Sequence, residues 1–187
     1  YSASRFLFRA SLFRRFGFFF EQEIDIAGLR VFMETLKRAL KIKRIDFQQS
    51  FNRNLFFLHF KTGVIKTEFT YFPFPRIEAG MPQYGVAVDS LLDIAVNKVF
   101  TIYQRTQARD YIDLFCICRN KGYTVGDLIK KARIKFDWHI DPLQLGTQFV
   151  KAQDAPDMPR MIAKIGKAEW QGFFMDEAEK LGPQVIG

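Results

Sequence analysis

The stretch SLLDIAVNKVFTIYQRTQARDYIDL, residues 90–114, predicts two helices that carry charged side chains beside a continuous apolar stripe. Lys98 and Arg105 lie seven positions apart, so on a straight helix they point the same way, as two cations that bind one anion would. Asp110 and Asp113, three positions apart, also share a face. A solvated salt-bridge ladder gives a similar pattern, so the spacing alone leaves a binding site and an exposed charged face equally open.

The chain that follows this stretch is predicted to be helical. Asp89 or Ser90 and Thr124 are suited to cap helices, and Pro142 suits a first helical turn. An apolar stripe of Leu128, Ile129, Ala132 and Phe136 predicts a helix that packs on a core. The expected helices span 89–104, 108–120, 124–136, 142–152 and 167–181.

The chain before the stretch mixes a helix with strands. Apolar residues recur at helical spacing after Asp25, and strand candidates follow at 42–50, 54–60 and 64–72, which suggests an antiparallel meander. In the third strand Glu68 stands on the face opposite the aromatic pair Phe69 and Tyr71. A carboxylate there is explained either by an ion pair with Lys66 or another neighbour, or by a bound cation.

The first twenty residues contain four arginines and seven phenylalanines but no acid. One interpretation is an amphipathic targeting peptide. The other, which we prefer, is a helix capped by Ser2 or Ser4 and a strand containing GFFF, residues 17–20, covered on both faces.

Prolines and glycines in PFPRIEAGMPQYG, residues 73–85, indicate a domain boundary, because they suit neither a helix nor the centre of a sheet. The expected fold class is therefore α+β, with an α/β domain over 1–85 and an α-helical domain over 86–187.

The amino-acid composition limits the classes of binding partner that we expect. A net charge of +8 favours a polyanion such as nucleic acid or a nucleotide phosphate. Cys116 and Cys118 have no further Cys or His nearby, so we expect packed thiols rather than a zinc site. No apolar run approaches the length of a membrane span, so the expected location is the cytoplasm, with no membrane partner.

Catalytic motifs based on serine, cysteine or histidine are absent from the sequence, and we expect His59 and His139 to be packed or surface residues. The remaining chemistry combines carboxylates with cations. Glu68 could hold Mg²⁺, and Lys98 with Arg105 could neutralise phosphate oxygens during group transfer. The alternative for these two cations is ordinary solvated helix charge.

Residues 90–114 resemble the signature of the AbiEii/AbiGii family of abortive-infection nucleotidyltransferases. The matching positions are Leu92-Asp93-Ile94-Ala95, Lys98, Arg105, Arg109-Asp110 and Asp113-Leu114. The segment VIKTEFTYFPFPRI, residues 64–77, and the loop 154–159 followed by Trp170 also look like parts of this family. The resemblance covers the chain from about residue 18.

The resemblance implies a small mixed nucleotidyltransferase-like (polymerase-beta-like) sheet with flanking helices, followed by a helical domain. It implies transfer of a nucleotide from an NTP with Mg²⁺, a toxin paired with an antitoxin, and tRNA or another RNA as acceptor. The residues carry over as follows: Glu68 as a metal-side carboxylate, Lys98 as a triphosphate contact, Asp110 and Asp113 as the acids of the helical motif, and Arg105 and Arg109 as residues that orient phosphate or acids.

One family motif is missing. The Asp-x-Asp pair that would hold the catalytic metals is expected between Gly17 and Phe18, and no such pair occurs there. The alternatives are a deletion that makes a non-catalytic relative acting as a basic RNA- or partner-binding module, residues missing from the sequence at this point, or a different alignment of the first residues.

Overall fold

In the computed structural model, the described residues are 15–83, 85–159, 161 and 164–182, and they form two compact units that divide between Pro75 and Arg76. The division lies inside the proline- and glycine-containing segment 73–85. The expected first helix, with Ser2 or Ser4 as its cap, falls outside the described residues.

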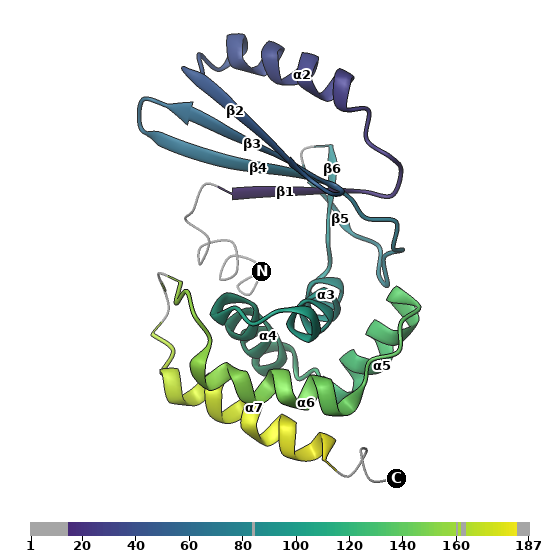
Figure 1. The fold of residues 1–187 in the computed structure, drawn as a ribbon. Helices are drawn as coiled ribbons and strands as arrows, with labels where there is room; N and C mark the ends of the chain where they lie inside the picture. Colours follow the sequence, from purple (N-terminus) through teal and green to yellow (C-terminus); the bar gives the residue numbers. More distant parts are fainter. Residues whose placement is uncertain (1–14, 84, 160, 162–163, 183–187) are drawn as a thin grey trace. The chain divides into compact units, whose positions relative to one another are not determined.

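The first unit is a four-stranded mixed sheet with one helix (Figure 1). The strand order is β1-β4-β3-β2; β1 runs parallel to β4, and the other neighbours are antiparallel. The predicted meander and mixed sheet are therefore confirmed. Its elements are β1 (Arg15–Phe20), α2 (Ile26–Ala39), β2 (Arg44–Ser50), β3 (Arg53–Phe60) and β4 (Gly63–Tyr71).

Helix α2 forms an apolar core with one face of this sheet. Met33 of α2 and Phe56, Leu58 and Phe69 of the strands are buried together, because alternate strand residues point to the same face. The other face carries Glu68, as predicted from the alternation in β4. This arrangement corrects one expectation: β1 is an edge strand, and Phe19 and Phe20 are exposed rather than covered on both sides.

The second unit is helical apart from a short hairpin (Figure 1). Ser90 and Thr124 cap their helices, each accepting a hydrogen bond from the backbone N–H three residues on, and Pro142 begins α6. The elements are β5 (Met81–Gln83), β6 (Val86–Val88), α3 (Leu91–Gln104), α4 (Ala108–Lys121), α5 (Val125–Phe136), α6 (Pro142–Val150), the 3₁₀ turn η1 (Lys151–Asp154) and α7 (Lys167–Leu181).

The β5–β6 hairpin lies in a segment from which we expected no strand. Pro82 is tolerated because this ladder has only two strands, and Gly85 adopts the positive φ of 80° that the connection needs. In the rest of the unit α3 packs against α4, α5 and α6, and α7 packs against α4 and α6. Tyr111, Phe149, Trp170 and Phe174 fill the interior between these helices.

Candidate functional site

Four predicted site residues gather where α3 meets α4, and we call them the α3–α4 charge cluster: Lys98, Arg105, Asp110 and Asp113. Lys98 Nζ donates to Asp110 Oδ1 at 2.7 Å and pairs with Asp113 Oδ2 at 2.6 Å. Arg105 donates to Asp110 Oδ2 from Nη2 at 3.1 Å and from Nε at 3.3 Å. Two cations do converge on one anion, and that anion is the buried carboxylate of Asp110.

Arg105 reaches this carboxylate differently from the expectation. Helix α3 ends at Gln104, and Arg105 is its C-cap in an extended conformation with φ −154° and ψ 156°. The prediction that Lys98 and Arg105 share one face of a straight helix is therefore wrong. The turn between α3 and α4 brings the guanidinium to Asp110, which lies in the first turn of α4, where the helix dipole stabilises an acid.

The α3–α4 charge cluster is electrically neutral within itself, with two cations and two carboxylates. Burial alone would lower the pKa of Lys98, but the carboxylates of Asp113 and Asp110 outweigh it and raise that pKa above 10.5. Lys98 therefore remains a cation at neutral pH. Its side chain is 21% exposed, so an anion from solvent can reach it.

Arg109 is the one predicted helical-site residue outside the cluster. It precedes Asp110 in α4 and is exposed, and it makes no hydrogen bond or ion pair with the part of the chain that the structure describes. Its charge is therefore available to a phosphate, in contrast to the charges of Lys98 and Arg105, which already contact carboxylates.

Glu68 lies in the other unit, on the sheet face opposite α2. Arg53 Nε donates to Glu68 Oε1 at 2.6 Å, and the Thr70 hydroxyl donates to the same oxygen at 3.2 Å. Burial alone would raise the pKa of Glu68, but these hydrogen bonds and the charges of Arg53 and Lys66 hold it below 4.5. Glu68 is thus an ionised carboxylate that already has a cation.

The residues around Glu68 do not fit a divalent-metal site. The residue beside it on β1 is Gly17, which has no side chain. Within the described ranges no group of three or more His, Cys, Asp or Glu side chains could hold a metal ion. A two-metal transfer site needs several carboxylates, so we derive no step through a metal here.

Two pairings were missed from the sequence. His59 Nε2 lies 2.8 Å from Asp46 Oδ2, on the same sheet face as Glu68. Asp93 and Lys135 form a fully buried ion pair at 2.7 Å, with side-chain exposures of 0% and 3%. The signal for the second pair was Lys135 itself, because it lies seven residues after Leu128 on the buried stripe of α5, where a lysine needs a buried partner.

Asp93 links three segments of the helical unit. Besides Lys135 it accepts hydrogen bonds from the N–H groups of Ile77 and Glu78, at 2.9 and 3.1 Å, and from the Ser90 hydroxyl at 2.9 Å. It therefore fixes the segment that follows Pro75 against α3 and α5. This role is structural, although Asp93 belongs to the motif that led us to the site.

Both thiols are predicted to be unreactive in the folded protein. Burial raises the pKa of Cys116 to about 11 and that of Cys118 to about 12, so little thiolate forms near neutral pH. We expect iodoacetamide at pH 8 to modify neither thiol in the native chain and both in urea, as measured by mass spectrometry. Rapid native modification of either would contradict this packing.

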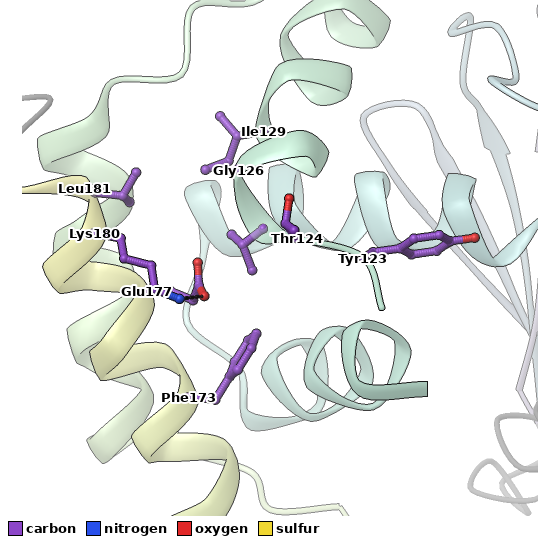
Figure 2. Close-up of a pocket in the computed structure, with 9 residues that line it drawn as sticks. Tyr123, Thr124, Gly126, Ile129, Phe173, Glu177, Lys180 and Leu181 are labelled. Carbon is purple, nitrogen blue, oxygen red and sulfur yellow. Dashed lines mark hydrogen bonds and ion pairs between the residues drawn. The ribbon is translucent and has the colours of Figure 1, made fainter. Parts of the chain in front are cut away.

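A pocket of about 470 Å³ lies elsewhere in the helical unit, between the start of α5 and the end of α7 (Figure 2). Tyr123, Thr124 and Gly126 line one side, and Phe173 and Glu177 the other. Glu177 is paired with Lys180 at 2.7 Å. The pocket contains none of the predicted site residues, so the α3–α4 charge cluster remains the candidate.

The small mixed sheet and the helical unit that follows it share the fold of solved proteins described as nucleotidyltransferases. A model of the nucleotidyl transferase AbiEii toxin family, of type IV toxin–antitoxin systems, matches residues 18–183, and the chain belongs to that family. The family resemblance and the fold class expected from the sequence are thus confirmed.

Two solved structures share the fold. A candidate nucleotidyltransferase from H. pylori has a TM-score of 0.54 and 16% identity, covering 100% of this chain and 85% of its own. JHP933 from Helicobacter pylori has a TM-score of 0.51 and 16% identity, with coverages of 99% and 94%. No curated protein matches the chain. Among the described residues, no helix has the length and apolar character to cross a bilayer.

Proposed function

We propose that this protein transfers a nucleotide from an NTP to an RNA acceptor such as tRNA, as the toxin component of a toxin–antitoxin system in the cytoplasm. The observation that carries the proposal is the α3–α4 charge cluster, whose residues occupy the positions of the family signature. A cognate antitoxin is the expected protein partner.

The cluster is suited to hold the triphosphate. Asp110 and Asp113 use two of the three N–H bonds of Lys98 and fix the direction of the third, while Arg105 retains N–H groups that Asp110 does not occupy. Arg109 adds a charge that is not compensated within the described residues. In the transfer, the acceptor hydroxyl oxygen bonds to the α-phosphorus, the bond from that phosphorus to the bridging oxygen breaks, pyrophosphate leaves, and the hydroxyl proton passes to solvent. These cations would stabilise the charge on the leaving pyrophosphate.

Magnesium is the metal expected of the family. The family resemblance implies Glu68 as a ligand, but Arg53 already neutralises this carboxylate, and no described neighbour completes a ligand set. The proposal therefore assigns roles only to the residues of the chain and leaves the metal as a component to be varied in the assay.

The test is to incubate the full chain with tRNA, Mg²⁺ and each radiolabelled NTP in turn, and to measure label in the RNA. We expect transfer with the native chain and loss of transfer in Asp113→Asn, because Lys98 then loses one of its two orienting charges. Glu179→Gln, an exposed change on α7, should transfer normally. Absence of both NTP binding and RNA labelling in the native chain would contradict an enzyme.

The pairing of Glu68 with Arg53 favours a second candidate, a family member without catalysis that binds RNA or an acidic partner through its basic surface. For this candidate we expect salt-dependent RNA binding without nucleotide transfer. The labelling assay distinguishes the two: an enzyme transfers nucleotide and loses transfer in Asp113→Asn, whereas the second candidate transfers none and binds RNA equally well in the native chain and in Glu68→Gln.

A further inference from the structure

In the turn between β2 and β3, Phe51 combines an unfavourable backbone conformation with an exposed apolar side chain. Ser50 and Arg53 pair across the strands, so Phe51 and Asn52 form the connection. Phe51 has a φ of 48°, in the left-handed region that favours glycine or asparagine, and its side chain is 96% exposed. A glycine would relieve the strain and remove the exposed ring. A bulky side chain kept in this strained and exposed position marks Phe51 as a candidate contact residue.

The turn is held firmly to the neighbouring strand. Asn52 Nδ2 donates to the carbonyl of Tyr71 at 2.9 Å, and the backbone carbonyl of Asn52 accepts from the N–H of Tyr71 at 3.1 Å. These two bonds fix the residue next to Phe51 to the end of β4. The ring is therefore presented from a rigid support, which reduces the entropy lost when a ligand binds.

A guanidinium follows Phe51 two residues along the chain. Arg53 begins β3, its side chain is 43% exposed, and it contacts Glu68 through Nε. Its Nη groups donate to no acceptor among the described residues, so they can reach a phosphate in the two-bond geometry that arginine favours. The strand register also places Arg53, Thr70 and the exposed Phe19 in one row across three strands.

We propose that the β2–β3 turn binds single-stranded RNA, with Phe51 stacking on an unpaired base and Arg53 bonding to an adjacent phosphate. An exposed aromatic ring next to an arginine provides the stacking platform and the cation that such RNA requires. The charge of this sheet face also favours RNA binding. The face carries more cations than acids, with Arg44, Arg53 and Lys66 against Asp46 and Glu68, and the whole chain carries +8. The inference rests on the proposed RNA acceptor but concerns binding, which is separable from transfer.

The test uses the full chain and a fluorescently labelled twelve-nucleotide single-stranded RNA, without NTP, in an anisotropy titration. Phe51→Gly should weaken binding roughly 5- to 150-fold, the effect of losing one base stack. It should leave the unfolding temperature unchanged or raised, because glycine suits the positive φ. Phe51→Trp should bind as tightly as the native chain, since indole also stacks.

Two controls make the test specific. Phe32 of α2 is 53% exposed and lies on the helix that packs on the other sheet face, so Phe32→Ala should bind RNA normally. Arg53→Gln should weaken binding and lower the slope of log Kd against log salt by about one, the loss of one phosphate contact.

Native binding by Phe51→Gly, or an equal loss in Phe32→Ala, would overturn the proposal. A protein partner that is lost with Phe51→Gly while RNA binding is retained would also overturn it. If RNA binding depends on Phe51 and no transfer occurs, this inference stands and the enzyme proposal fails. If transfer occurs while Phe51→Gly binds RNA normally, the enzyme proposal stands and this inference fails.

Discussion

Lys135→Met is expected to lower the free energy of unfolding by about 3–5 kcal/mol, the usual cost of removing one partner of a buried ion pair. The variant leaves the carboxylate of Asp93 fully buried, with only neutral donors from Ile77, Glu78 and Ser90. Methionine matches the length of the lysine stem, so the lost stability would come from removing the charge rather than from creating a cavity. Urea unfolding at pH 7, followed by circular dichroism, gives the value.

The matched control is Lys130→Met on the same helix. Lys130 is exposed and pairs with Asp127 at 3.5 Å, so its removal should change stability by no more than about 0.5 kcal/mol. The double variant Asp93→Asn/Lys135→Met should lose less than the sum of the single losses, because it removes both charges and leaves neither one unpaired. Equal stabilities for Lys135→Met and Lys130→Met would refute the buried pair.

The ion pair between Asp93 and Lys135 also makes the stability of the fold depend on pH in the acid range. Burial alone would raise the pKa of Asp93, but Lys135 and the donors of Ile77, Glu78 and Ser90 hold it below its ordinary value of 3.8. A depressed pKa contributes stability that is present above 3.8 and is lost as the pH falls through the folded-state value. The native chain should therefore lose stability steeply below pH 3.8, and Asp93→Asn should lose less there.

Local patterns were enough to predict most elements of the fold. The structure places helices α3 to α5 and α7 within two residues of the predicted spans, because helical spacing depends on residues three or four apart. Helices α3 and α5 also have the capping side chains that the sequence indicated. The meander was predictable because β2, β3 and β4 follow one another with short turns. The β5–β6 hairpin was missed because a proline normally counts against a strand, and a two-stranded ladder relaxes that rule.

The contacts of the site depended on information that spacing does not contain. Asp110 and Asp113 were placed correctly on one face, since one helix holds both. The partner of Glu68 is Arg53, fifteen residues away, and it is set by the strand register. Asp93 and Lys135 are separated by 42 residues and meet only through the packing of α3 on α5. The path of Arg105 depends on where α3 ends.

Lys98→Met is expected to reduce kcat/KM for nucleotide transfer about 100-fold or more, the usual effect of removing one oriented donor from a developing charge. The variant also leaves Asp113 without its cation and Asp110 with Arg105 alone, so stability should fall by about 1–3 kcal/mol. Activity must therefore be compared at a temperature where circular dichroism shows both proteins folded. Lys121→Met, an exposed change at the end of α4, should keep full activity and stability.

The pH dependence separates the two roles of Lys98. Its pKa lies above 10.5 because Asp113 and Asp110 outweigh the effect of burial, so its contribution to stability is complete below 10.5 and is lost as the pH rises through the folded-state value. Lys98→Met should remove this alkaline loss of stability. If Lys98 only supports the fold, the folded variant will bind NTP as tightly as the native chain in equilibrium dialysis. If Lys98 contacts the triphosphate, NTP binding will weaken even at pH 7, where the native lysine is fully charged.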